Sequence, residues 1–200
     1  MRLVLVRHGA TAWSVAARHT GTTDLPLTEL GREQAAATAK GIRRLFGKDF
    51  ESSNVYSSPL VRSLETASIV CGRTRTIIED PRLLEFNYGD YEGLAPAAIR
   101  ELRPQWDIWR DGCPNGETVE AVGHRVDAFI ASLPSGEETN MVFSHGHLIR
   151  ILAAKSIGLV AEQGRIFTLD TATISVIEDV RGKRVIKLWN LDASLLSSSK

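Results

Sequence analysis

The sequence has little cysteine, no excess of charge of either sign and no long apolar run. Cys71 and Cys113 are the two cysteines in 200 residues. Their spacing fits neither a disulfide framework nor a metal site, and free thiols are typical of the cytoplasm. Lysine plus arginine and aspartate plus glutamate both number 24, which excludes a globally basic nucleic-acid binder.

Other absences narrow the class further. No apolar stretch approaches the length that crosses a membrane, and the chain enters an apolar strand directly, without a signal segment. There is no internal repeat. We therefore expect a cytoplasmic protein with no nucleic-acid or membrane partner, folded as one domain over residues 1–193 and followed by a flexible serine-rich tail over 194–200. The sequence leaves open whether a homodimer forms.

Strand and helix patterns alternate along the chain. The apolar run at 2–6 predicts a buried strand, and Thr28 predicts the N-cap of a helix over 29–46. The apolar face of this helix would draw on Leu30, Ala35, Ala37, Ile42 and Leu45. Further strands are predicted at 55–56, 76–78, 173–177 and 185–188, and further helices from Ser58-Pro59 and over 117–133 and 148–157. This order predicts an α/β fold with a mostly parallel sheet and helices on both faces.

The predicted strand at 2–6 and a second apolar run at 141–143, which also predicts a strand, both lead into histidine. Leu3 to Val6 runs into Arg7-His8-Gly9, and Met141 to Phe143 runs into Ser144-His145-Gly146-His147. Open α/β sheets place their ligands at the carboxyl ends of the strands. Two histidines delivered there, one beside an arginine, predict a site that holds and attacks an anionic group.

Four other segments add to this pattern. They are Thr20 to Gly31 with the run Asp24-Leu25-Pro26-Leu27-Thr28, Ser57 to Ala67 with Arg62, Leu84 to Gly93 with Glu85, and Gly116-Glu117-Thr118. Together with the two histidine segments, and in this order, they resemble the histidine phosphatase superfamily, also called phosphoglycerate mutase-like. The resemblance covers the chain from its first strand to His147.

The resemblance implies a three-layer α/β/α sandwich and a phosphohistidine mechanism that needs no metal or other cofactor. His8 would be the nucleophile, and Arg7, Arg62 and His145 would surround the phosphate of a small phosphoester substrate. Glu85 would donate a proton to the leaving oxygen and later activate water. By the same resemblance, the substrate-binding set would be Ser14, Thr20, Gly21, Arg110 and His147. Within this set, Arg110 would contact a distal phosphate or a substrate hydroxyl.

Elementary chemistry agrees with these roles. Histidine attacks phosphorus only as the neutral imidazole, and neighbouring arginines should lower the pKa of His8 from about 6.5. The same guanidiniums bind phosphate oxygens in pairs. Glu85 must be protonated to act as an acid, and a phosphate dianion beside it favours that state. A covalent intermediate divides one difficult displacement into two easier ones.

Plainer interpretations stand beside the functional ones. His8 could cap a strand end, Arg62 could be a solvated helix residue, Glu85 a surface carboxylate and His145 a core histidine. His147 could face the substrate or only pack. His19 could contact a second anionic group of the substrate, but the simpler interpretation is an exposed loop residue. Trp106 and Trp109 are interpreted as core or lid packing, and His124 has no predicted role.

Within the superfamily, the short segment between Gly93 and Gly116 favours a phosphatase over a mutase. The runs at 19–28, 85–93 and 106–118 resemble a subgroup of sugar-phosphate phosphatases that contains the fungal sedoheptulose-1,7-bisphosphatase and bacterial acid phosphatases. The chain departs from the fungal enzyme in having no long insertion after the second histidine, and in carrying His19 where tyrosine is usual. A phosphoglycerate mutase is the alternative enzyme, and a binding protein that has lost the chemistry is the alternative outside enzymes.

Overall fold

A six-stranded sheet forms the centre of the computed structural model, which describes residues 1–134, 136 and 138–198. The strand order is β3-β2-β4-β1-β5-β6. The four strands from β3 to β1 are parallel, β5 is antiparallel to β1, and β6 is antiparallel to β5. The bounds are β1 Arg2–Arg7, β2 Asn54–Ser57, β3 Ile78–Glu79, β4 Thr139–Ser144, β5 Ile174–Val180 and β6 Lys183–Leu191.

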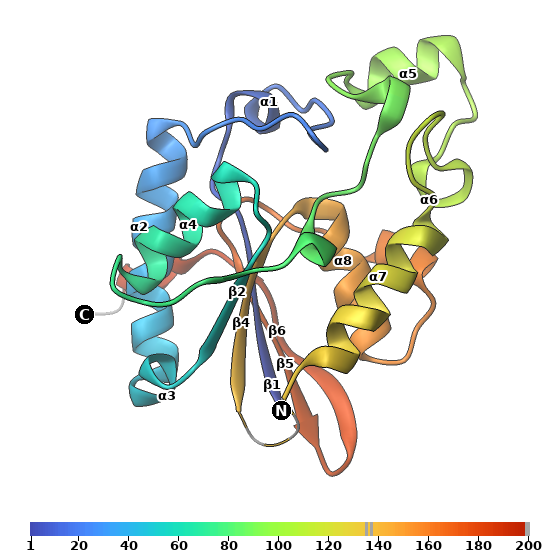
Figure 1. Ribbon diagram of the computed structural model, residues 1–200. Helices are drawn as coiled ribbons and strands as arrows, with labels where there is room; N and C mark the ends of the chain where they lie inside the picture. The colour runs from blue at the N-terminus through green and yellow to red at the C-terminus, as the bar shows by residue number, and fades with distance from the viewer. Residues whose placement is uncertain (135, 137, 199–200) are drawn as a thin grey trace.

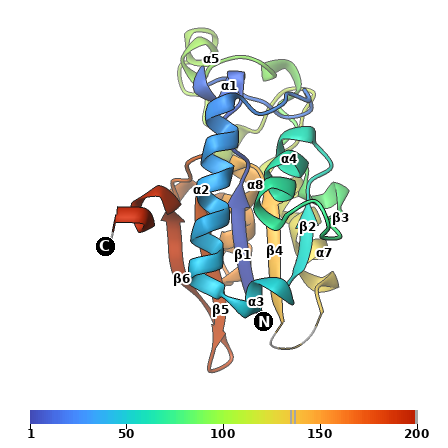
Figure 2. The same ribbon diagram turned by 90° about the vertical axis from the view of Figure 1, so that its left-hand side faces the viewer.

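Helices cover both faces of this sheet (Figures 1 and 2). On one face lie α2 (Glu29–Phe46), α3 (Lys48–Glu51) and α4 (Val61–Cys71). On the other lie α7 (Val119–Ser132) and α8 (Gly146–Ser156). The short helices α1 (Ala12–Val15) and α5 (Pro96–Leu102) lie beyond the carboxyl end of β1, and α6 (Ile108–Asp111) leads towards α7. The predicted α/β class, with a mostly parallel sheet between helices, is confirmed.

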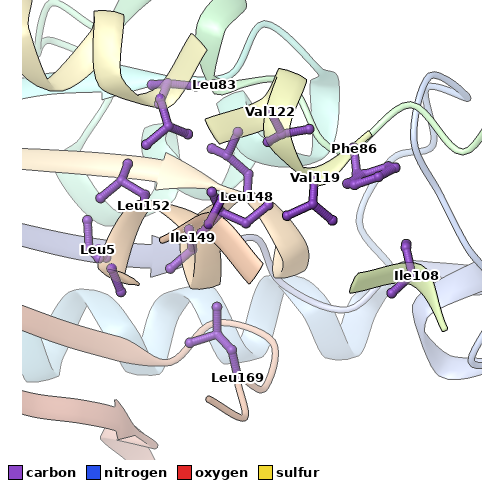
Figure 3. Packing of buried hydrophobic residues seen from close by; sticks show 14 of the residues in the cluster. Leu5, Leu83, Phe86, Ile108, Val119, Val122, Leu148, Ile149, Leu152 and Leu169 are labelled. Carbon is purple, nitrogen blue, oxygen red and sulfur yellow. The ribbon is translucent and has the colours of Figure 1, made fainter. Parts of the chain in front are cut away.

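Alternation along β1 supplies both cores. Successive side chains of a strand point to opposite faces of the sheet. Leu3 and Leu5 therefore enter the core under α7 and α8, while Val4 and Val6 enter the core under α2 and α4. All four are fully buried. Figure 3 shows the first of these cores, where Leu148 and Leu152 of α8 pack near Leu5.

Helix α2 has the predicted bounds and buries only part of the predicted apolar face. Thr28 is its N-cap and accepts a hydrogen bond from the Gly31 amide. Ala35 and Ile42 are buried, whereas Leu30 is 51% and Leu45 41% exposed. The buried stripe consists mostly of small residues, because α2 approaches its neighbours closely enough for backbone contact at Gly31.

Helix α4 begins later than the sequence predicts. Ser58 still belongs to the end of the sheet, where its amide donates to the Phe143 carbonyl at 3.0 Å. Pro59 therefore precedes the helix instead of lying in its first turn. Leu60 is the N-cap residue, and the side chain of Asp24 accepts from the Val61 amide at 2.8 Å.

The last two strands form a hairpin, and its turn is shorter than the gap between the strands predicted at 173–177 and 185–188. Val180 pairs with Lys183, so only Arg181 and Gly182 lie between them, with φ angles of 55° and 76°. Two positive φ values are typical of the type I′ turn that suits a two-residue hairpin.

The remaining elements are short 3₁₀ helices: η1 (Pro81–Leu83), η2 (Gly89–Tyr91), η3 (Ala161–Ile166) and η4 (Ala193–Ser198). The predicted tail thus includes most of η4, and its last two residues lie outside the described part of the chain. Both cysteines are buried free thiols. Within the described residues, no helix has the length and apolar character needed to cross a membrane.

Candidate active site

The register of β1 and β4 brings the two histidine segments together. Arg7 pairs with Ser144 in this parallel ladder, so the next residues, His8 and His145, leave the sheet side by side. Their ring centroids lie 5.2 Å apart at an angle of 60°. The chain continues from β1 to α2 on one face and from β4 to α8 on the other. Such a divergence is the position where open α/β sheets form their ligand crevice.

The tautomer of His8 follows from its hydrogen bond. Its Nδ1 lies 2.7 Å from the Gly9 carbonyl oxygen, which can only accept, so Nδ1 carries the proton. Nε2 is left with the lone pair. The side chain is 4% exposed, and burial, followed by the charges of Arg7 and Arg62, holds its pKa well below 6.5. His8 is therefore a neutral imidazole with a defined nucleophilic nitrogen.

A pH titration tests this assignment. Because protonation of His8 occurs only below its depressed pKa, acidification from pH 8 to pH 5 should leave the ring neutral. We expect the His8 imidazole resonances in NMR spectra, assigned by their loss in His8→Asn, to stay at neutral-ring positions over this range. The histidines of the urea-unfolded chain should titrate with a pKa of about 6.5. A His8 midpoint at or above that value would contradict the assignment.

The glycine after His8 is required by a close backbone contact. A Cβ atom at Gly9 would lie 2.3 Å from the Gly31 carbonyl oxygen, and one at Gly31 would lie 2.2 Å from the Ala10 carbonyl oxygen. The first turn of α2 therefore packs directly on the segment that follows the nucleophile. Both obstacles are backbone atoms, which cannot rotate away.

Gly9→Ala should consequently destabilise the fold and displace His8. We expect a loss of about 1–3 kcal/mol in the free energy of unfolding, the usual cost of overpacking, measured by urea denaturation. Gly158→Ala is a matched glycine control, since nothing lies within 4 Å of a Cβ atom there, although its φ of +85° adds local strain. Gly9→Ala no less stable than this control would show that the contact relaxes freely.

A cavity of about 200 Å³ opens beside His8. It is lined by residues from the ends of β1 and α8 and from the loops that cover them: Arg7, His8, Ser14, Ala17, Arg18, His19, Thr20, Glu85, Tyr88, Pro96, Gly146, His147, Arg150 and Leu169. The predicted nucleophile, proton donor and first arginine therefore share one cavity. A larger hollow of about 700 Å³ lies at the opposite end of β1, but it has no histidine and its Arg2 is paired with Asp49 and Glu178.

Arg7 offers hydrogen-bond donors to an anion. Its Nη1 donates to the Leu169 carbonyl at 2.5 Å, whereas its Nε is buried without a partner in the described structure. Buried donors are normally satisfied. A phosphate oxygen bound in the cavity would satisfy this one.

Arg62 and His145 form a layer behind His8. Arg62 is fully buried and donates through Nε to His145 Nδ1 at 3.2 Å, while its other nitrogens donate to the carbonyls of Thr20, Gly21 and Thr23. His145 Nε2 lies 2.8 Å from the Ser58 hydroxyl. Neither residue lines the cavity. The structure therefore places both next to the nucleophile, where the charge of Arg62 acts on His8.

Glu92 and Gly21 hold the loop that receives Arg62. The Glu92 carboxylate accepts from the amides of Gly21 and Thr23 at 2.9–3.0 Å. A Cβ atom at Gly21 would lie 2.5 Å from the Phe86 carbonyl oxygen. Gly21, which was predicted to bind substrate, does not line this cavity, and its small size allows the close packing.

Glu85 is oriented by the start of α8. Its Oε1 accepts from the amides of Phe86 at 2.9 Å and Leu148 at 3.0 Å, and its Oε2 lies 3.2 Å from the His147 amide. The side chain is 7% exposed. Helix N-termini favour carboxylates because their first amides have no partner within the helix. The carboxyl group is thus fixed at the wall of the cavity that His8 also lines.

Aromatic rings build another part of the wall. His147 Nδ1 lies 2.7 Å from the Tyr88 hydroxyl, and His19 stacks on Tyr88 with centroids 4.4 Å apart. His19 was expected to be an exposed loop residue, which is wrong: it is 9% exposed and contacts the ring of Trp106. Burial lowers the pKa of His19 to about 4 and that of His147 well below 6.5, so both rings are neutral.

The structure divides the remaining predicted substrate residues. Ser14 and Thr20 line the cavity. Arg110 does not: it lies on α6, with its side chain 63% exposed, and pairs with the neighbouring Asp111 at 2.8 Å. It lines a different hollow, together with Arg103, Trp106 and Asp111, so the structure does not set it beside the cavity at His8.

Several site residues escaped the sequence analysis, among them Ser58, Tyr88, Arg18 and Arg150. Ser58 and Tyr88 lie inside the motif segments but had no assigned role. Arg150 follows His147 by three residues on a helix, a spacing that puts both on one face. That spacing was the one available signal for Arg150. Among the described residues, no cluster of histidine, cysteine or carboxylate side chains is placed to hold a metal ion.

Comparison with known proteins agrees with this geometry. Residues 3–192 match the profile of the histidine phosphatase superfamily, branch 1. The chain belongs to this superfamily. It is 37% identical over 193 residues to an acid phosphatase of Mycobacterium tuberculosis, and this alignment covers 95% of this chain and 92% of that protein. It is 36% identical over 185 residues to the sedoheptulose 1,7-bisphosphatase of Saccharomyces cerevisiae, covering 79% and 68%.

Solved structures of histidine phosphatases share the fold. The product of open reading frame Rv3214 of Mycobacterium tuberculosis aligns with a TM-score of 0.87 at 36% identity, over 96% of this chain and 98% of that one.

Probable phosphoglycerate mutases of Yersinia pestis are also relatives, at 32% identity over 97% of this chain and 92% of theirs. The predicted family and enzyme class, a phosphatase of the histidine phosphatase superfamily, are confirmed by these relatives.

Proposed function

We propose that this histidine phosphatase hydrolyses monoesters of small phosphorylated metabolites, sugar phosphates among them, through a phosphohistidine on His8. The observation that carries the proposal is the His8 ring itself. Its Nδ1 proton is engaged by Gly9, and its Nε2 lone pair is free in a cavity that Arg7 and Glu85 also line. A cavity of about 200 Å³ suits a small ester.

In the first step, the Nε2 lone pair of His8 attacks phosphorus, and the bond between phosphorus and the ester oxygen breaks. The leaving oxygen takes a proton from Glu85, and the product alcohol departs. In the second step, Glu85 takes a proton from water while the water oxygen attacks phosphorus. The N–P bond breaks, and its electron pair returns to His8. Arg7 stabilises the transferring group through charge-assisted hydrogen bonds.

The relatives favour hydrolysis of sugar phosphates. The acid phosphatase and the sedoheptulose 1,7-bisphosphatase are among the curated proteins to which the chain is most similar. The specific alternative is a phosphoglycerate mutase, which the probable mutases of Yersinia pestis favour.

Phosphate release across a panel of sugar phosphates, nucleotides and glycerates tests the proposal. We expect turnover of several small esters, undiminished by a chelator, and little interconversion of 3- and 2-phosphoglycerate. Isomerisation with little phosphate release would favour the mutase. No turnover and no protein labelling with any phosphoester would favour a binding protein that keeps only the fold.

A further inference from the structure

Arginine predominates among the charged residues that line the cavity, and the lining has more arginines than the one beside the nucleophile. The charged lining residues are three arginines, Arg7, Arg18 and Arg150, against the single carboxylate of Glu85. The histidines of the wall do not change this balance, since His8, His19 and His147 are all neutral at physiological pH. Arg7 lies next to the nucleophile and serves the reacting phosphate. Arg18 and Arg150 then remain without an assigned anion.

Arg150 is a partly buried cation without an ion pair in the described structure. Its guanidinium lies 4.5 Å from the centre of the Trp109 ring, and its Nε and Nη2 donate to the carbonyls of Gly164 and Arg165. Nη1 has no hydrogen bond in the described residues. Burial lowers the pKa of Arg150, while the charge of Glu85 opposes this effect. Removing a charge from water without a partner costs free energy, and a bound anion would recover that cost.

Arg18 is held in a similar way at the exposed edge of the cavity. Its guanidinium lies 4.5 Å from the centre of the Trp13 ring, and its Nε donates to the Gly93 carbonyl. No carboxylate of the described chain pairs with it. Each arginine thus has its Nε engaged by a carbonyl and one face covered by tryptophan. This support reduces the conformational entropy that a guanidinium loses when it binds an anion.

We propose that Arg150 and Arg18 form a second anion subsite, so that the preferred substrates carry a carboxylate or a second phosphate besides the phosphate that is transferred. This inference rests on the proposed function for its meaning, since the first anion is the phosphate at His8. Guanidinium groups bind both kinds of anion through paired hydrogen bonds. The distal-anion role that the sequence suggested for Arg110 therefore passes to these two residues.

Binding measurements separate this proposal from catalysis. Isothermal titration calorimetry on the full chain carrying His8→Asn, which should bind without turnover, compares ligands that differ in one anionic group. One pair is 3-phosphoglycerate against glycerol 3-phosphate, and the other is fructose 1,6-bisphosphate against fructose 6-phosphate. We expect the doubly anionic member of at least one pair to bind about tenfold more tightly or better, as charged hydrogen bonds imply. The pair that discriminates identifies the second group as carboxylate or phosphate.

Variants then locate the preference. In the His8→Asn background, Arg150→Gln should lower the affinity for the doubly anionic ligand about tenfold or more. The affinity for the singly anionic ligand of the same pair should fall by no more than about threefold. Arg18→Gln should act in the same direction with a smaller effect, because Arg18 is exposed. Arg150→Lys, which keeps the charge, should restore part of the preference. Arg73→Gln, an exposed arginine after α4 that does not line the cavity, serves as the matched control.

Three outcomes would overturn the subsite. One is equal affinity of the His8→Asn protein, with all its arginines intact, for both ligands of each pair. Another is an equal loss for both members in Arg150→Gln, which would assign Arg150 to structural support of η3. The third is a preference that survives both glutamine variants. The proposed function fails by a different result, the absence of phosphate release from any ester by the wild-type chain.

Discussion

Replacement of His8 by asparagine should reduce phosphate release by about 10⁴-fold or more, the scale expected when a covalent nucleophile is removed. The cause is the loss of Nε2, because the asparagine amide can hydrogen-bond to Gly9 but cannot attack phosphorus. The measurement is initial-rate phosphate release from the best substrate of the panel. Rapid mixing with a ³²P-labelled ester should also trap an acid-labile phosphoprotein in the wild type and none in His8→Asn.

A matched histidine controls for damage to the fold. His124 is exposed on α7 and does not line the cavity, so His124→Asn should retain wild-type activity. Thermal melting should show both variants folded. Activity of His8→Asn within tenfold of the wild type, or a labelled intermediate that survives the substitution, would remove His8 from the mechanism. A strict requirement of the wild type for added metal would contradict a mechanism that needs no metal.

Replacement of Glu85 by glutamine should cost about 10²- to 10⁴-fold in the hydrolysis of an alkyl phosphate, the usual range for general acid–base catalysis. The carboxyl group lies in the same cavity as His8 and is fixed by the amides of Phe86, His147 and Leu148. Glutamine has nearly the same shape but cannot donate and recover a proton. The defect should appear in kcat with the best sugar phosphate of the panel.

The choice of leaving group isolates the proton transfer. p-Nitrophenolate departs without a proton, so the first step of p-nitrophenyl phosphate hydrolysis should suffer far less in Glu85→Gln than that of an alkyl phosphate. The initial burst of p-nitrophenol measures this step. Glu120→Gln, a change at an exposed carboxylate in the first turn of α7, is the control for charge and fold. An equal defect with both leaving groups would mean that Glu85 only positions α8 or the substrate.

Local patterns predicted elements where the sequence and the packing favour the same structure. The N-cap at Thr28 gave the start of α2, and the apolar run before Arg7 gave the central strand. Predictions failed where a distant contact overrides local preference. Pro59 suits a first helical turn, but Ser58 is held by the sheet, and α4 begins two residues after the proline. Leu30 and Leu45 fit an apolar face, yet α2 buries small residues at its close contacts.

The candidate site divides in the same way. His8 and His145 follow buried strands, so the sequence could predict that both reach the same edge of the sheet. The sequence could not predict which side chains are buried. His19 lies in a loop and was expected to be exposed, but the ring of Tyr88 stacks on it in the folded chain. Arg110 pairs with Asp111, its neighbour in sequence, whereas only the fold sets Arg150 in the cavity.

The sequence by itself determined the superfamily, the alternation of strands and helices, and the residue types that the chemistry needs, because motifs and periodicity are properties of neighbouring residues. The tertiary structure alone decided which of those residues line the cavity. It placed Arg62 behind His8 and left Arg18 and Arg150 without carboxylate partners in the described chain. These features depend on distances between segments far apart in sequence, which only the packing of the sheet and its helices sets.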